Sequence, residues 1–347
     1  MKQLDVICFT KNGENLAARI QQKLSEKYNI QIMSKCSHSR TQTEVERNRV
    51  TMAEWIEQGF SHKHSLLFIG AVGIAVRGIA PYLKDKLTDS PVLVMDELGT
   101  YVIPILSGHV GGANEIARLL EKDLGARAVI TTSTDLNHKF AVDLFAKKRG
   151  YVIEPKEGIA KISSKILAGD RVSIWAEKQI EGRFDSAIVI TDKEKADIMI
   201  SPYQMPLQPL LQLIPKVFVI GIGCKKGKTK EEIEVVMMEC LKENRIDASA
   251  IVCFTSIDIK KAEEGICLLA RDYEVPFVTF DKRTLQAVAG EFCGSDFVKS
   301  QVGVENVCAR SAMAACAEGG HLVADKFAKD GVTIAIAEKK WRVNADE

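Results

Sequence analysis

The sequence lacks the features of a membrane or secreted protein. No apolar run approaches the roughly 18 residues that span a bilayer, and the opening MKQLDVICFTKNG has a single early lysine without a signal-peptide cleavage pattern. The nine cysteines include no C-x-x-C pair, so they indicate neither a disulfide framework nor a thiolate zinc site. We therefore expect a cytoplasmic protein whose thiols are reduced.

An excess of charge of one sign is also absent. Lysine and arginine number 47 against 46 aspartate and glutamate residues, so no global field would hold the chain on nucleic acid or an anionic membrane. The six histidines show no H-x-x-x-H or histidine–carboxylate spacing on one helix face, so we expect no protein metal site. An anionic ligand must then be captured by a local site.

What the sequence does contain is an alternation of strand-like and helical patterns almost from end to end. Strand-like runs such as LDVICFT, SLLFIG and KVFVIGIG are separated by helical patterns. This alternation predicts an α/β protein of several domains, with open, largely parallel sheets flanked by helices. We predict an N-terminal α/β domain over 1–136, a small middle α/β domain and connector over 137–215, and a C-terminal α/β domain over 216–347.

A glycine-rich turn in VIGIGCKKGKTKEEI looks like a nucleotide-binding P-loop. Walker A requires four residues between its glycines, whereas Gly223 and Gly227 enclose three and Gly221 and Gly227 enclose five, which argues against ATP or GTP hydrolysis. A strand-to-helix turn still offers N–H groups to an anion, and Cys224, Lys225 and Lys226 lie within it. It therefore suits a carboxylate; the alternative is a solvated turn with surface lysines.

The segment PILSGHVGGANEIARLL joins a strand to a helix and contains His109. Its glycines would let the backbone approach a ligand, and the helix start would offer amides to an oxyanion. His109 could take a proton there, although a lone histidine is more often structural. Ser107 lacks the G-x-S-x-G setting of a serine nucleophile, so covalent catalysis is a minor alternative.

Polar residues also gather at the ends of other predicted strands. In the N-terminal domain they are Lys84 before the strand PVLVMD, Asp96 and Glu97 after it, and Thr132 and Asp135 at the end of the next strand. Because the carboxyl ends of strands form the ligand crevice of an open α/β sheet, these side chains could converge with His109. Ser256 and Asp258 lie at a comparable strand end of the C-terminal domain and could contact a ligand there. Turn or helix-cap roles are the alternative for each of them.

Together these segments resemble a known family. The order GIAVRGIAPYLKDKLTDSPVLVMDELGTYVIPILSGHVGGANEIARLL, AVITTSTD, GIGCKKGKTKEEI, VGVENVCARSAMAA and VTIAIAEKK resembles the cobalt-precorrin-5A hydrolases, the CbiG family of anaerobic cobalamin (vitamin B12) biosynthesis. The SGH-x-GGAN and GIGC-[KR]-[KR]-G elements carry most of the likeness. The resemblance also implies that the C-terminal domain is similar to the separate CobE protein of the aerobic pathway.

The resemblance implies a cobalt-tetrapyrrole substrate. The family reaction opens the δ-lactone of cobalt-precorrin-5A with water and releases acetaldehyde, giving cobalt-precorrin-5B. Because the cobalt arrives with the substrate, no cofactor of the protein's own is implied. Transient contacts with neighbouring pathway enzymes are compatible with this function, and a non-catalytic tetrapyrrole carrier of the same pathway is the alternative.

This chemistry requires a base for water attack and a partner for the oxyanion. We hypothesise that His109 is the base and that Glu97 or Asp96 orients it. Amides near Gly111 and Gly112 and the side chains of Lys84 and Asn114 would stabilise the oxyanion. We expect the substrate to contact Ser107, Gly108, Gly111, Gly112, Asn114, Asp96, Thr132, Asp135, Gly221, Gly223, Cys224, Lys225, Lys226, Gly227, Ser256 and Asp258.

Overall fold

The chain forms two compact units in the computed structural model, Met1–Lys139 and Phe140–Glu347. The structure describes residues 1–37, 50–85, 88–109, 111–132, 139–206, 209–294, 300, 303–316 and 319–346. Within these residues, no helix has both the length and the apolar character needed to cross a membrane.

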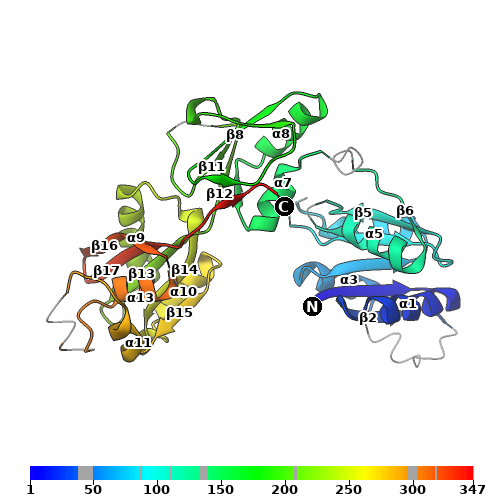
Figure 1. The fold of residues 1–347 in the computed structure, drawn as a ribbon. Coiled ribbons are helices and arrows are strands. Elements are labelled where there is room, and N and C mark those ends of the chain that lie inside the picture. Colours follow the sequence, from blue (N-terminus) through cyan, green and yellow to red (C-terminus); the bar gives the residue numbers. More distant parts are fainter. Residues whose placement is uncertain are drawn as a thin grey trace. The chain divides into compact units, whose positions relative to one another are not determined.

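A six-stranded sheet in the order β2-β1-β3-β4-β5-β6 forms the centre of the first unit (Figure 1). Its strands are β1 (Lys2–Cys8), β2 (Tyr28–Ser34), β3 (Ser65–Ile69), β4 (Val92–Met95), β5 (Tyr101–Leu106) and β6 (Arg127–Ala128). The first four strands are parallel, whereas β5 runs antiparallel to β4, and β6 is parallel to β5. The carboxyl ends of β5 and β6 therefore lie at the edge where β3 and β4 begin.

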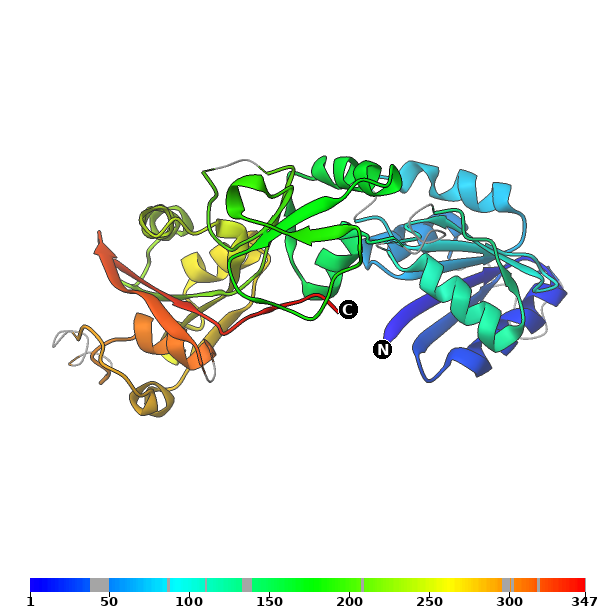
Figure 2. The ribbon, with the colours of Figure 1, turned by 45° about the horizontal axis from the view of Figure 1, so that its top comes forward.

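Helices cover both faces of this sheet (Figure 2). α1 (Lys11–Leu24) and α5 (Ala113–Leu124) pack on one face, and α3 (Met52–Ser61) and α4 (Val72–Ile79) pack on the other. Because β3 is covered on both faces, all five of its residues are buried, as expected for a central parallel strand.

The described residues of the second unit form two five-stranded sheets and a two-stranded one, and the first five-stranded sheet is small because its strands are short. Its order is β10-β8-β11-β12-β7, with only β7 antiparallel to its neighbour. The strands are β7 (Val152–Glu154), β8 (Val172–Ala176), β10 (Ile188–Ile190), β11 (Ile198–Ile200) and β12 (Leu211–Ile214), accompanied by helices α7 (Val142–Arg149) and α8 (Gly158–Leu167).

The second sheet of this unit has the order β15-β14-β13-β17-β16. Its strands are β13 (Phe218–Cys224), β14 (Ile251–Ile257), β15 (Phe277–Phe280), β16 (His321–Lys329) and β17 (Val332–Glu338). The first three are parallel, and the hairpin β16–β17 adds two antiparallel strands beside β13. Helices α9 (Lys230–Glu243) and α10 (Glu264–Asp272) pack on one face, and α11 (Lys282–Ala287) and α13 (Cys308–Cys316) on the other.

The C-terminal segment returns from this sheet to the region of the smaller one, where it forms a separate two-stranded sheet. Residues of β18 (Val343–Asn344) pair with β9 (Ile180–Glu181), and Arg149 Nε donates to the carbonyl oxygen of Asn344 at 2.9 Å. Just before it, the buried Glu338 accepts a hydrogen bond from Trp341 Nε1 at 2.6 Å and lies 3.3 Å from Lys178 Nζ. Figure 1 shows this return as the red segment running towards the green strands.

The predicted α/β class, with several largely parallel sheets flanked by helices, is confirmed. The antiparallel strands β5, β7, β16 and β17 were not expected. The domain boundaries near 136 and 215 stay a prediction, since the second compact unit holds both the middle and the C-terminal sheet.

Candidate functional site

The SGH-x-GGAN loop leads from β5 into α5, and its glycines are needed for the loop's own close packing. A Cβ atom on Gly111 would lie 2.3 Å from Ser107 Cβ, and one on Gly108 would lie 2.6 Å from Asn114 Oδ1. Gly112 precedes the first residue of α5 with φ +96°, a left-handed conformation that favours glycine. A larger side chain at Gly108 or Gly111 would have to move its neighbours in the loop, whereas at Gly112 it would strain the backbone.

Hydrogen bonds from predicted residues hold this loop in place. Ser107 Oγ donates to the carbonyl oxygen of Asp89 at 2.9 Å, and the Asn114 amide donates to the Gly108 carbonyl at 2.8 Å. The buried Asn114 side chain also donates to Thr132 Oγ1 at 3.2 Å, which ties the loop to the segment after β6. Ser107, Asn114 and Thr132 are thus brought together, as predicted, and fix the conformation of the loop around His109.

Lys84 reaches the same edge of the sheet. The Asp89 carboxylate accepts hydrogen bonds from the Lys84 amide at 3.1 Å, while the Asp89 carbonyl receives the Ser107 hydroxyl. The Lys84 side chain is exposed, and His109 is half-buried with its Nε2 atom shielded from solvent. Through Asp89, the backbone of Lys84 is thus tied to the loop that contains His109. The predicted Asp135 lies outside the described residues.

Asp96 and Glu97 do not lie at this edge, so the hypothesis that either orients His109 is wrong. They follow β4, and the antiparallel β5 places its six residues, about 20 Å of strand, between them and the loop. Glu97 instead accepts a hydrogen bond from the Thr10 hydroxyl.

Asp96 forms the turn between β4 and β5. Its carboxylate accepts backbone hydrogen bonds from Leu98 and Tyr101. Burial raises the pKa of Asp96, but the hydrogen bonds from Tyr101, Thr100 and Leu98 outweigh it and hold the pKa below its usual value. Asp96 thus has the turn role that the sequence analysis gave as the alternative to ligand binding.

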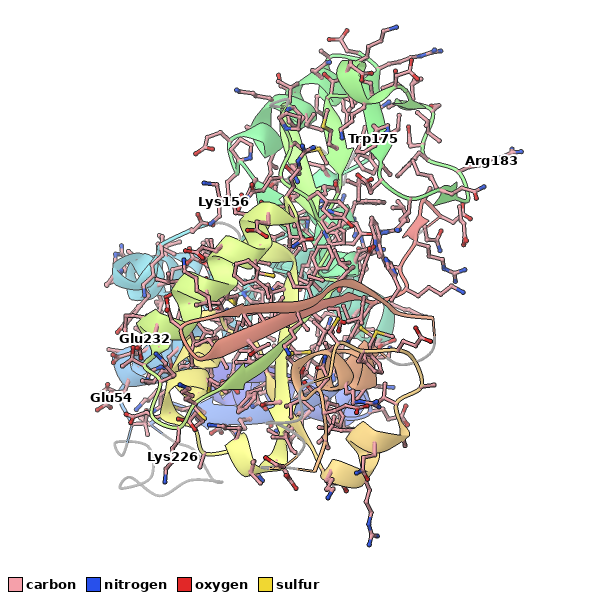
Figure 3. The ribbon with its side chains drawn as sticks, turned by 90° about the vertical axis from the view of Figure 1, so that its left-hand side faces the viewer. Glu54, Lys156, Trp175, Arg183, Lys226 and Glu232 are labelled. Carbon is pink, nitrogen blue, oxygen red and sulfur yellow. The ribbon has the colours of Figure 1, made fainter. Side chains whose placement is uncertain are left out.

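A second candidate site is a cavity of about 460 Å³ at the carboxyl edge of β13 and β14. Five predicted residues line it: Gly223, Cys224, Lys225, Lys226 and Ser256. Figure 3 shows Lys226 in the turn between β13 and α9, with Glu232 in the first turn of that helix. The glycine-rich turn is therefore one wall of a cavity.

The Gly227 amide, predicted to receive an anionic ligand, is already occupied by the protein's own carboxylate. It donates to Glu263 Oε1 at 2.7 Å, and Lys260 Nζ lies 2.7 Å from Glu263 Oε2. Burial raises the pKa of Glu263, but the hydrogen bonds from Lys260 and the Gly227 amide lower it by more. The pKa therefore lies below its usual value. The turn does bind a carboxylate through its backbone amide, but this carboxylate is the side chain of Glu263.

Two of the predicted residues, Gly221 and Ser256, have structural roles, and Asp258 lies outside the cavity lining. A Cβ atom on Gly221 would lie 1.9 Å from the Cys308 carbonyl oxygen, so this glycine lets β13 approach α13. The fully buried Ser256 hydroxyl donates to the Ile222 carbonyl at 2.7 Å. Asp258 is exposed and lies outside the cavity lining.

The thiols that line this cavity are poor nucleophiles at neutral pH. Burial raises the pKa of Cys224, and it raises that of Cys308 to about 12. The pKa of Cys293 is raised chiefly by its hydrogen bond with Asp325. Over the described ranges, no group of three histidine, cysteine, aspartate or glutamate side chains is placed to hold a metal ion.

The lining residues that the sequence did not predict include Lys326 and Asn306. Lys326 belongs to β16, which reaches the cavity only because β16 and β17 fold back beside β13. Asn306 lies in the segment VGVENVC, but no motif or residue spacing in the sequence marks it as a site residue.

Comparisons with known proteins match most of the chain between residues 54 and 337. Three family models match in succession: "Cobalamin synthesis G N-terminal" over residues 54–135, "Cobalamin biosynthesis central region" over 140–215 and "Cobalamin synthesis G C-terminus" over 218–337.

Two curated relatives carry one name, cobalt-precorrin-5A hydrolase. The protein of Salmonella typhimurium is 33% identical over 299 residues, covering 82% of this chain and 84% of its own length. That of Priestia megaterium is 29% identical over 309 residues, covering 82% and 81%. Among solved structures, CobE, a protein from the cobalamin biosynthetic pathway, is 26% identical and matches with a TM-score of 0.35, covering 39% of this chain and 96% of its own.

Proposed function

Because the chain belongs to the CbiG family of cobalamin synthesis proteins, we propose that it is a cobalt-precorrin-5A hydrolase. The observation that carries this proposal is the 33% identity to a relative of that name over 82% of the chain. The reaction adds water to the lactone carbonyl of cobalt-precorrin-5A and releases acetaldehyde, giving cobalt-precorrin-5B. Cobalt is part of the substrate, and we propose no cofactor held by the protein itself.

The SGH-x-GGAN loop is the proposed centre of the chemistry. Water oxygen bonds to the lactone carbonyl carbon while His109 takes the water proton. The bond from this carbon to the ring oxygen then breaks, and His109 returns the proton to the departing oxygen, which becomes a hydroxyl group. In the second step His109 takes the proton of that hydroxyl as the adjoining carbon–carbon bond breaks. The hydroxyl carbon becomes the carbonyl carbon of acetaldehyde, and the electron pair of the broken bond passes to the macrocycle.

The geometry supports a specific set of partners for this base. The amides of Ala113 and Asn114 donate to carbonyls within the loop, so the proposed oxyanion donors are the amides of Gly111 and Gly112 together with the Lys84 ammonium group. Ser107 and Asn114 hold the loop rather than reacting themselves. Glu97 and Asp96 take no part in orienting His109, because they lie at the other edge of the sheet.

We further propose that the protein works in the cytoplasm and passes its product to the next enzyme of the pathway by transient contact. The near balance of 47 basic and 46 acidic residues supports a small-molecule substrate rather than nucleic acid or a membrane surface.

Acetaldehyde release from cobalt-precorrin-5A, coupled to NADH oxidation by alcohol dehydrogenase, tests the function and the base together. We expect His109→Ala to lower kcat by about 10²- to 10⁴-fold, or about 3 to 5 kcal/mol, as loss of a general base does. His62→Ala, which removes an exposed histidine on the same unit, is the matched control and should leave kcat unchanged.

Equal release by both variants and the wild type would exclude His109 as the base while leaving the hydrolase function intact. Substrate binding by the wild type without acetaldehyde release above the enzyme-free control would instead favour the carrier function.

A further inference from the structure

The cavity beside β13 is lined by more positive than negative side chains. Its charged residues are Lys225, Lys226, Lys260, Lys326 and Glu305. The chain as a whole has almost equal numbers of basic and acidic residues, so this imbalance is local. A cavity of this charge favours an anionic ligand.

Ion pairs neutralise only part of this lining. Lys260 pairs with Glu263 at 2.7 Å, and Glu305 pairs with Arg310 at 3.3 Å. In contrast, no carboxylate of the described chain lies within 4 Å of the ammonium groups of the other three lysines. Three positive charges thus remain to face a ligand: Lys225, Lys226 and Lys326.

A β-bulge directs Lys326 to the cavity. Between Ala324 and Phe327, β16 advances three residues while β17 advances two, which leaves an extra residue in β16. The carboxylate of Asp325 accepts hydrogen bonds from the Cys293 amide at 2.8 Å and from Asn306 Nδ2 at 3.3 Å, and so braces the cavity wall. Lys326, the next residue, lines the cavity itself.

The turn between β16 and β17 supports Lys225. The Lys225 amide donates to the Gly331 carbonyl at 2.9 Å. Gly331 has φ +76°, and a Cβ atom on it would lie 2.9 Å from Lys225 Cδ, so the lysine side chain runs over this glycine. The β16–β17 hairpin therefore contributes Lys326 directly and positions Lys225.

Apart from Ser256, Asn306 and Thr333, the rest of the lining is largely apolar. Ile257 and Val307 are buried, whereas Ile259 is 67% exposed, unusually so for an isoleucine beside a cavity. The first turn of α13 also borders the cavity, capped by Asn306, whose Oδ1 accepts from the Ala309 amide at 2.8 Å. An apolar surface edged by cations matches a flat apolar ring that carries carboxylates on its periphery.

We propose that this cavity binds the peripheral carboxylates of the macrocyclic substrate through Lys225, Lys226 and Lys326, with Ile259 against the ring face. The identity of the ring rests on the proposed hydrolase function. The cavity is a binding site on the C-terminal sheet, and its lysines take no part in the proton transfers assigned to His109.

Binding of uroporphyrin, a fluorescent octacarboxylic porphyrin, to the full chain tests this site without the native substrate. We expect Lys326→Gln to raise Kd about fivefold, the effect of one exposed ion pair, and the triple variant with Lys225→Gln and Lys226→Gln to raise it about 100-fold. Lys326→Arg should retain the wild-type Kd. Lys242→Gln, which removes an exposed lysine from α9 on the opposite face of the sheet, should have no effect.

Wild-type affinity in the triple variant would overturn the proposal. So would an equal loss with Lys242→Gln, or equal binding of a tetracationic porphyrin, since either would show that these lysines do not select carboxylates.

The acetaldehyde assay separates this proposal from the proposed function. We expect the triple variant to raise KM for cobalt-precorrin-5A with kcat nearly unchanged. If the triple variant is active and its KM is unchanged, the proposed binding role of the cavity is wrong and the proposed hydrolase function still stands. Lysine-dependent porphyrin binding by a wild type that releases no acetaldehyde would support the cavity and overturn the hydrolase.

Discussion

Neutralising Glu263 should weaken the fold and strengthen anion binding at the same time. Its carboxylate accepts the Gly227 amide and pairs with Lys260, and the two paired side chains are only 10% and 16% exposed. Breaking a fully buried ion pair costs about 3 to 5 kcal/mol. In Glu263→Gln the amide oxygen can still accept from Gly227, and the freed Lys260 faces the hydrated cavity. We therefore expect a loss of about 1 to 2 kcal/mol in the free energy of unfolding.

The pH dependence of this loss has a defined sign. Because the pKa of Glu263 is lowered in the folded state, the ionised carboxylate stabilises the fold above its unfolded value of about 4.5. That contribution disappears as the pH falls through the lower, folded pKa. The stability difference between wild type and Glu263→Gln should therefore be full at pH 7 and shrink as the pH is lowered from 5 towards 3.

Urea unfolding followed by circular dichroism measures the first effect, and uroporphyrin titration measures the second. With Glu263 neutral, Lys260 becomes a fourth uncompensated lysine, so Kd should fall about fivefold. Glu239→Gln is the control, since its pair with Lys329 is 39% and 47% exposed and should be worth less than about 1 kcal/mol. Unchanged stability together with unchanged porphyrin affinity would refute the reasoning.

Further substitutions test the N-terminal unit. Asp96→Ala should lower the free energy of unfolding in urea by about 1 to 3 kcal/mol, because it leaves two turn amides without their acceptor. It should preserve kcat; a kcat as low as that of His109→Ala would show that Asp96 takes part in the reaction. Gly111→Ala should lower kcat at least tenfold by forcing the loop off Ser107, whereas Gly125→Ala, where a Cβ atom meets open space, should cost only about 1 kcal/mol for its left-handed φ. Equal kcat values for the two glycine variants would show that the loop tolerates the displacement.

Part of the N-terminal site followed from the sequence. Alternating patterns predicted the α/β class, and the residues of the SGH-x-GGAN loop and Thr132 do meet at one sheet edge. The direction of β5 was misjudged, although the sequence held a signal for it. Only five residues separate Met95 from Tyr101, and parallel neighbours need a crossover of about a dozen residues or more, so the short link indicates an antiparallel hairpin.

The C-terminal cavity was less predictable. The turn around Lys225 was visible as a glycine-rich pattern, but its occupation by Glu263 depends on a contact between segments 36 residues apart. The position of Lys326 depends on a bulge in a strand whose partner is set by tertiary pairing. Hydrophobic periodicity in the sequence indicates which face of a helix or strand is apolar, but it does not indicate register shifts between strands or ion pairs between distant segments.

The return of the C-terminal segment has a mechanical consequence. The chain leaves the smaller sheet of the second unit at Ile214 and returns beside it through β18, which pairs with β9 in the segment between β8 and β10. The larger sheet is therefore joined to the region of the smaller one at both ends. A body tethered at one point can swivel in every direction, whereas one tethered at two points retains mainly the rotation about the line that joins them. The larger sheet and its cavity are thus joined to the smaller-sheet region at two points, which leaves less freedom of rotation than a single connection would.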